Sequence, residues 1–306
     1  MPRIEPAVMT MEFSVPVSTA ARYIDISAAA SVLNRKFFRQ GLNWVLGGAT
    51  IVSAPTSAGD ITMSHLQTNW VTANSWTKAF KAWKRQQDDA LDEGDQQSIK
   101  GRYNDFKIFA DIQHTETAAP HFLLPRDLDG AVYNAPEEWL HSLVVVPNNA
   151  GVVGDTEDYT LHMHGPDTGT SRGMIQAYRD SRSTPQSPDP ATPGNAAIGL
   201  YTDMFNTGMD DTEIVLNAEF RNDELPYDQD LYPGGVSNGP TLQLMNRITL
   251  NPASTIPGKY NLRGGTIPCG IIKIDAAAVT AEFTLILHMV PGEHRGYMAQ
   301  PMQEMN

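Results

Sequence analysis

Two stretches of this sequence, roughly half a chain apart, follow the same pattern, and such internal similarity constrains the fold more than any other feature. Residues 142–167 and residues 269–293 each begin with a short β-branched run, pass through a turn of small residues, and reach an aromatic residue followed by Thr-Leu. The aromatic residues are Tyr159 and Phe283. Internal repeats are typical of chains built from copies of one unit. The pattern therefore predicts two copies of one β-domain, although two unrelated hairpins of an all-β protein would also look alike.

The rest of the chain is consistent with a protein made mostly of strands. Several segments alternate apolar and polar residues or are rich in β-branched residues, as strands require. Among them are 9–17, 42–52, 60–66, 105–114 and 241–250. The chain has 306 residues, 41% of them hydrophobic, which is enough for two domains with separate cores. We therefore predict an all-β fold of two antiparallel jelly-roll sandwiches, a double jelly roll, with the first roll at 1–168 and the second at 169–306. One large roll with long loops is the alternative.

The clearest helix of the sequence interrupts this pattern and is expected as an insertion in the first roll. Residues 74–91 place Trp76, Phe80 and Trp83 at helical spacing, with Asn74 as the expected N-cap. Basic residues beside tryptophans can indicate contact with nucleic acid. These tryptophans occupy the apolar stripe, however, so we expect them to be buried against a sheet while the charged face lies in solvent.

The balance of charges limits the partners of the chain. Acidic residues number 35 and basic residues 22, for a net charge of -13, and neither end carries a run of Arg or Lys. This composition argues against a surface built to neutralise phosphates. The strongest local exception is the segment Arg35, Lys36, Phe37, Phe38 and Arg39. We expect it to face a membrane or a genome, and we expect nucleic-acid binding to be weak or confined to such a patch.

Candidate catalytic and metal-binding residues are few. His162 and His164 would point to the same side of an expected strand, but no third ligand stands at a recognised spacing. The single cysteine, Cys269, lies at an apolar strand start and is expected to be buried and inert. We therefore predict no catalytic residue, cofactor, metal site or small-molecule substrate. Structural calcium at paired loop carboxylates stays open. The pairs are Asp127 with Asp129 and Asp228 with Asp230.

An acidic, all-β chain of this length, with two similar sandwiches and long loops, resembles the double jelly-roll major capsid proteins of small tailless icosahedral viruses, some of which contain lipid. The architectural resemblance covers nearly the whole chain. The stretches at 34–44 (NRKFFRQGLNW) and 69–83 (NWVTANSWTKAFKAW) are also similar to segments of capsid proteins from single-stranded DNA viruses.

The resemblance implies a structural subunit rather than an enzyme. In such viruses three subunits form a pseudo-hexagonal capsomer, so we expect a homotrimer that contacts neighbouring capsomers in the virion. A shell over an internal membrane suits a chain without a basic arm, and the loops at 180–195 and 221–240 would face outward. Because residues 1–10 lack a signal-peptide pattern and no apolar run is long enough to span a membrane, we expect synthesis in a host cytoplasm.

Three alternatives stay open at this point. A single jelly-roll capsid protein of a small circular DNA virus is one, although such proteins usually carry an Arg-rich arm. An enzyme on a cupin-like roll is another: His162 and His164 begin its metal pattern, but the expected Glu does not follow and His288 comes late. A carbohydrate-binding or spike-like β-protein is the third, and it would use loop tyrosines. Candidates for that role are Tyr201, Tyr227 and Tyr232.

Overall fold

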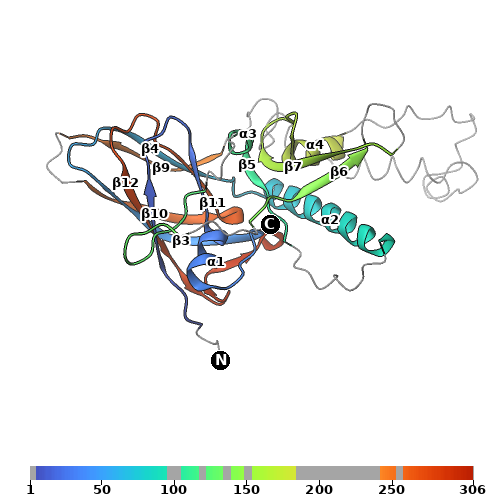
Figure 1. Cartoon of the computed structure of the whole chain (residues 1–306), viewed down its shortest axis with the longest axis horizontal. Coiled ribbons are helices and arrows are strands. Elements are labelled where there is room, and N and C mark those ends of the chain that lie inside the picture. The colour runs from blue at the N-terminus through green and yellow to red at the C-terminus, as the bar shows by residue number, and fades with distance from the viewer. Residues whose placement is uncertain are drawn as a thin grey trace, which may run out of the picture.

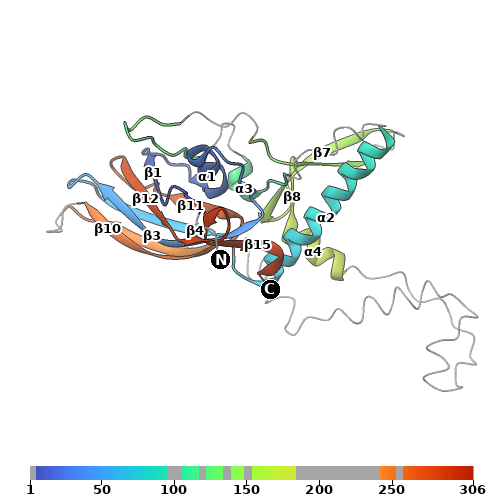
Figure 2. The ribbon, with the colours of Figure 1, turned by 90° about the horizontal axis from the view of Figure 1, so that it is seen from below.

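The molecule has two parts that lie end to end along its longest axis. In the computed structural model of the chain, the described residues are 5–94, 105–116, 122–133, 139–147, 154–183, 242–252 and 258–305. A sandwich of two antiparallel sheets forms one part, and a smaller sheet with helices forms the other (Figure 1). The view from below shows the same division, with helices α2 (Trp70–Glu93) and α4 (Met174–Ser183) at the end of the sandwich (Figure 2).

Eight strands build the sandwich, and a short ninth strand extends it. Their bounds are β1 (Thr10–Val15), β2 (Arg22–Asp25), β3 (Leu42–Ser53), β4 (Gly59–His65), β9 (Gln243–Leu250), β10 (Lys259–Ile267), β11 (Ile271–Asp275), β12 (Phe283–Met289) and β15 (Ala299–Pro301). The first sheet has the order β1-β12-β3-β10, and β15 also pairs with β3. The second sheet has the order β2-β11-β4-β9.

The path of the chain through these sheets is that of a jelly roll. Successive strands alternate between the two sheets from β1 to β4 and again from β9 to β12, while β4 and β9 pair with each other. Eight antiparallel strands wound in this way through two sheets form a jelly-roll sandwich. The predicted all-β class with antiparallel sheets is therefore confirmed.

The alternation of apolar residues explains why the two sheets pack face to face. In β1 the side chains of Met11, Phe13 and Val15 are buried, while those between them are more exposed. β12 follows the same alternation with Phe283 and Leu285, and it pairs with β1 along its length. Because successive residues of a strand point to opposite faces, such a pattern turns one side of each sheet inward, where burial stabilises it.

The prediction of two rolls is not confirmed, because one sandwich takes strands from both halves of the chain. β1 to β4 lie before residue 168 and β9 to β12 lie after it, yet β1 pairs with β12 and β3 pairs with β10. Among the described residues, a boundary between 1–168 and 169–306 therefore does not separate two sandwiches. The pattern within one strand specifies a buried face but not a distant partner, such as His288 for Thr10.

The predicted repeat of one hairpin is wrong. In the first stretch, β6 (Leu143–Pro147) and β7 (Thr156–His164) pair as an antiparallel hairpin. In the second stretch, β11 and β12 belong to different sheets, so Ile271 pairs into the second sheet and Phe283 into the first. The two stretches share a pattern because each contains two consecutive, partly buried strands, not because they are copies of one unit.

The connection between β4 and β9 is a long insertion with its own secondary structure. Its elements are α2 (Trp70–Glu93), β5 (Phe109–Asp111), α3 (Ile112–Thr115), β6, β7, β8 (Ser171–Gly173) and α4 (Met174–Ser183). Strand β7 is central: β6 pairs with it antiparallel, whereas β5 and β8 pair with it parallel. The predicted helix thus lies in a small module of helices and strands that the roll carries between two neighbouring strands.

A second apolar core joins this insertion to the roll. Tyr23 of β2 and Ile271 of β11 are buried on the outer face of the second sheet. They belong to one cluster with Ile108 and Met163 of the insertion, while their neighbour Ile272 belongs to the core inside the sandwich. Strands β2 and β11 are therefore covered on both faces, and consecutive residues such as Tyr23 and Ile24 or Ile271 and Ile272 are buried on opposite sides of the sheet.

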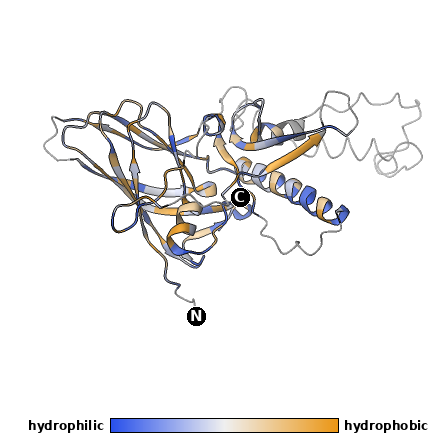
Figure 3. Cartoon of the chain, viewed as in Figure 1, coloured by the Kyte–Doolittle hydropathy of each residue, from blue (hydrophilic) through white to orange (hydrophobic). Residues whose placement is uncertain are grey.

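Helix α2 begins earlier than the sequence indicates. Asn69 is its N-cap, and the side-chain oxygen accepts a hydrogen bond from the N–H of Thr72 at 2.9 Å. Asn74, the predicted cap, lies inside the helix. Trp76 is buried and stacks on Phe80 with ring centroids 5.0 Å apart, whereas Phe80 and Trp83 are half-buried, so the predicted burial is confirmed for Trp76 and only in part for the other two. The last turns of the helix are hydrophilic and project away from the roll (Figure 3).

The strand predicted at residues 105–114 is much shorter. Only Phe109–Asp111 forms β5, and α3 follows at once. The carboxylate of Asp111 accepts hydrogen bonds from the N–H of His114 at 2.9 Å and from the hydroxyl of Tyr23 at 2.7 Å. This N-cap turns the chain into a helix where alternation alone favoured a longer strand.

The two predicted surface loops lie partly or wholly outside the described residues. The loop predicted at 221–240 lies outside the described residues. The beginning of the loop predicted at 180–195 belongs to α4, which extends to Ser183. No helix in the described ranges is long and apolar enough to cross a membrane.

Candidate functional site

Helix α1 (Ile26–Asn34) positions the basic and aromatic segment that the sequence singled out. Asp25 caps its first turn and accepts hydrogen bonds from two N–H groups at 2.8 and 3.1 Å. The helix ends where Arg35 takes a left-handed conformation with φ of 52°. The N–H of Arg35 donates to the carbonyl of Ser31 and closes the last turn. The residues that follow form a chain reversal that leads into β3.

Phe38 of this segment belongs to the core. Its side chain is 1% exposed, and its ring lies 5.8 Å from that of Trp44 and 5.5 Å from that of Tyr297. Its N–H donates to the hydroxyl of Ser31 at 2.9 Å. The prediction that both phenylalanines face a membrane or a genome is therefore wrong for Phe38, because an aromatic residue flanked by basic residues can still point inward.

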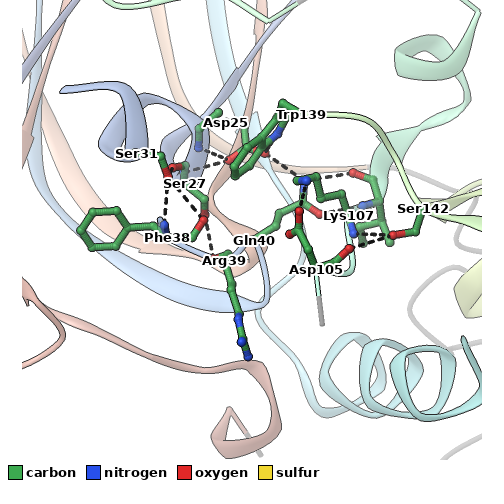
Figure 4. Close-up of polar contacts among 12 residues, drawn as sticks. Asp25, Ser27, Ser31, Phe38, Arg39, Gln40, Asp105, Lys107, Trp139 and Ser142 are labelled. Carbon is green, nitrogen blue, oxygen red and sulfur yellow. Dashed lines mark hydrogen bonds and ion pairs between the residues drawn. The ribbon is translucent and has the colours of Figure 1, made fainter. Parts of the chain in front are cut away.

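The other residues of the segment remain accessible. Arg35 and Arg39 are exposed, and Phe37 is half-buried. Lys36 is also half-buried, and its amino group lies 3.5 Å from the carboxylate of Glu5. The side chain of Arg39 extends away from the buried polar cluster beside it (Figure 4).

A further cation reaches the segment from the C-terminal end of the chain. Arg295 lies in the tight turn between β13 (Pro291–Gly292) and β14 (Gly296–Tyr297). Its guanidinium donates a hydrogen bond to the carbonyl oxygen of Phe37. Sequence reasoning missed Arg295, since a single arginine in a polar turn carries no signal and only the fold brings it here.

A cavity of about 630 Å³ lies between this segment, α2 and the C-terminal residues. Its basic lining consists of Lys36, Arg39 and Arg295. Its aromatic lining consists of Phe37, Trp76, Phe80 and Phe106. The remaining lining consists of Gly41, Leu42, His294, Pro301 and Gln303. The volume is within the range of small-molecule and cofactor sites, about 300–1,000 Å³.

The aromatic wall of the cavity is closely packed. The rings of Trp76 and Phe80 are stacked with 14° between their planes, and Phe106 meets Trp76 edge to face at 5.8 Å. A Cβ on Gly41 would lie 2.2 Å from Trp76 Cζ2, so glycine is what allows the indole to approach the backbone. The buried indole N–H of Trp76 has no hydrogen-bond partner among the described residues.

Beside the cavity, a buried polar cluster joins the roll to the insertion (Figure 4). Gln40 donates to Asp25 at 3.0 Å and accepts a hydrogen bond from the N–H of Ile108 at 2.7 Å. Trp139 donates to the same carboxylate at 3.1 Å. Burial raises the pKa of Asp25 to about 6, against the lowering effect of these donors. Because its members come from both parts, the cluster holds the two sides of the cavity in register.

Lys107 adds a buried charge to the same junction. Its side chain is 2% exposed, its amino group pairs with the carboxylate of Asp105, and it lies 4.5 Å from the ring centroid of Trp139. Its backbone N–H donates to the hydroxyl of Ser142 at 3.0 Å. A buried charge with such compensation is structural and is closed to an external ligand.

The two histidines of β7 are packed rather than assembled into a metal centre. His162 has one ring nitrogen 2.8 Å from the hydroxyl of Ser171 and the other 3.1 Å from the carbonyl of Pro166. Burial lowers the pKa of His164 to about 4. No group of three His, Cys, Asp or Glu side chains in the described chain could hold a metal ion. His288 lies elsewhere, on β12 of the roll.

Asp127 and Cys269, two of the remaining candidates, also have structural surroundings. Asp127 accepts hydrogen bonds from the N–H groups of Asp129 and Ala131, which is the pattern of a side-chain-stabilised turn. The expectation for Cys269 is confirmed, because its thiol is fully buried and burial raises its pKa. The second carboxylate pair and the three loop tyrosines lie outside the described residues. These are Asp228, Asp230, Tyr201, Tyr227 and Tyr232.

Comparison with known proteins assigns no relative to this architecture: no protein-family description, no curated protein and no solved structure matches the chain.

Proposed function

We propose that this protein is a viral capsid protein, a structural subunit of an icosahedral shell. The observation that carries the proposal is the single eight-stranded jelly roll with its long insertion between β4 and β9. Jelly rolls of this kind occur in viral capsid proteins, lectins and cupins. The resemblance of residues 34–44 and 69–83 to capsid segments favours the first of these three classes.

The interior of the roll supports a structural role over an enzymatic one. A cupin-like enzyme places polar ligands between its two sheets, whereas the described side chains that fill this space are apolar. The largest include Phe13, Trp44 and Leu46, each at most 2% exposed. A closely packed apolar interior serves rigidity and leaves recognition to the outer surfaces and the insertion.

We propose a subunit with one roll in place of the two that the resemblance implied. The pairing of β1 with β12 and of β3 with β10 supports this version. Three single-roll subunits supply three sandwiches, whereas a pseudo-hexagonal capsomer needs six. The single-roll version therefore replaces the pseudo-hexagonal capsomer with a shell of single-roll subunits. In this version the insertion supplies contacts between neighbouring subunits or projections on the virion.

Assembly is the first prediction. The purified protein is expected to form closed particles of uniform diameter, which light scattering and negative-stain electron microscopy would detect. A matched control is the variant Phe13→Asp, whose buried charge disrupts the roll and is expected to abolish particles. A folded wild-type monomer at micromolar concentration that forms no particles over a range of salt and pH would contradict the proposal. Specific glycan binding by that monomer would point to the lectin class instead.

A further inference from the structure

We infer that the cavity between the roll and the insertion binds one nucleotide unit of a single-stranded nucleic acid, with the base on the aromatic wall and the phosphate at Arg39 and Arg295. The inference deepens the proposed function and rests on it for the partner, a packaged genome. It concerns a local site in a chain whose overall charge is -13.

The shape and the aromatic lining suit a planar base. Trp76 and Phe80 form a stacked pair, and Phe37 from the segment after α1 also lines the cavity. Every base has a face that can stack on such rings, which is how proteins bind single strands with little sequence preference.

The charges of the lining suit a phosphate. Three of the twelve residues around the cavity are Lys or Arg, and the lining contains no carboxylate among the described residues. Glu5 lies near the rim, where its carboxylate is 3.5 Å from Lys36, so Arg39 and Arg295 are the better phosphate partners. Arginine presents a planar set of donors that matches phosphate oxygens. His294 offers hydrogen bonds without charge, since burial and Arg295 lower its pKa.

A lipid surface suits the same residues less well. Membrane contact needs apolar side chains that protrude from the surface, whereas Phe38 is in the core and Trp76 is 5% exposed within the cavity. A recess with an aromatic wall accepts a single planar group rather than a flat array of headgroups. We therefore do not infer that the segment 35–39 faces a membrane, and the test below includes membrane binding as a separate outcome.

The test measures binding of a fluorescently labelled short oligodeoxythymidylate to the full-length protein by anisotropy over a range of salt. Wild-type protein is expected to bind, and Arg39→Gln is expected to weaken binding about tenfold and to lower the salt slope by about one. The matched control is Arg263→Gln, which removes an exposed charge on β10 away from the cavity. Phe80→Leu keeps an apolar side chain and is expected to weaken binding without changing the salt slope. Circular dichroism melting checks the fold of each variant.

Several results would overturn the inference. Equal losses in Arg39→Gln and Arg263→Gln would show diffuse charge attraction, and unchanged binding in Phe80→Leu would exclude stacking in the cavity. Binding to phosphatidylserine vesicles but not to the oligonucleotide would assign the segment to a membrane. If the protein forms particles but binds no oligonucleotide, the inference about the cavity is wrong and the capsid proposal stands. If the protein binds the oligonucleotide but never assembles, the capsid proposal is wrong and the binding site stands.

Discussion

Asp25 is a buried carboxylate at the junction that accepts four hydrogen bonds. It caps α1, and its carboxylate also accepts hydrogen bonds from Gln40 of the roll and from Trp139 of the insertion. A carboxylate with four donors would ordinarily have a low pKa, but complete burial outweighs them and raises the pKa to about 6. The residue therefore couples the stability of the junction to pH.

The second prediction concerns this coupling. Because the folded pKa of Asp25, about 6, is above the unfolded value of 3.8, folding favours the protonated form. The contribution to the free energy of unfolding is complete below about pH 4 and is lost as pH rises through about 6, and the change is worth roughly 3 kcal/mol. Urea unfolding from pH 4 to 7.5 should show this dependence in the wild type but not in Asp25→Asn.

The quantity to compare is the change of unfolding free energy with pH in the wild type and in Asp25→Asn, rather than the absolute stability of either, for two reasons. Burial lowers the pKa of His141 to about 3 and that of His164 to about 4, which acts on stability in the opposite direction in both proteins alike. Asparagine also brings N–H donors toward Gln40, so the absolute stability of the variant falls by about 1–3 kcal/mol. Parallel pH curves for wild type and variant would contradict the role assigned to Asp25.

At the scale of elements, the insertion depends on side chains that complete the backbone hydrogen bonding of its helix and its sheet. Asn69 caps the start of α2, as described above. Farther along the helix, the amide of Gln86 donates to the carbonyl of Val145 at 2.6 Å and accepts from its N–H at 3.0 Å. The amide thus takes the place of a neighbouring strand along the edge strand β6 and blocks pairing with another chain.

The third prediction compares the two asparagines near the start of α2. Asn69→Ala removes the N-cap and is expected to lower the free energy of unfolding by about 1 kcal/mol. Asn74→Ala, at a position inside the helix, is expected to be neutral or to stabilise by a few tenths of a kcal/mol, because alanine has the higher helix propensity. Chemical unfolding of both variants measures the difference. A larger loss for Asn74→Ala would place the helix start where the sequence pattern indicated.

At the scale of the whole molecule, the decisive feature is that one roll is closed by strands from both ends of the chain. Strands β1 and β12 lie side by side, and the insertion emerges between β4 and β9 at the opposite sheet. The first core fills the sandwich and the second lies between the roll and the insertion. If the chain were a repeated domain, substitutions at equivalent positions would lower the unfolding free energy equally. Two unlike cores predict unequal losses.

The fourth prediction tests that inequality with the two residues that the repeat hypothesis aligned. Phe283 is 3% exposed inside the roll, and Phe283→Ala is expected to cost about 3–5 kcal/mol of unfolding free energy. Tyr159 lies on the insertion sheet, where its ring covers the guanidinium of Arg172 at 3.8 Å and its hydroxyl donates to Glu157. Tyr159→Ala should therefore cost clearly less in urea unfolding. Equal costs would contradict the difference in burial between the two sites.

The sequence by itself determined the local elements of this protein. Alternation of apolar and polar residues specified strands such as Thr10–Val15. The stripe containing Trp76 specified which face of α2 is buried. These features depend on neighbours within a few positions of the chain, where backbone geometry and residue spacing are enough to decide the outcome.

Only the tertiary structure decided which strands share a sheet and which side chains share a site. The run that begins at Ile271 and the run that begins at Phe283 look like two arms of one hairpin, yet they join different sheets, because a strand pattern selects a face and leaves the partner open. The cavity depends on the same long-range closure. Arg295 donates to the carbonyl of Phe37, 258 positions away, and no local pattern contains that distance.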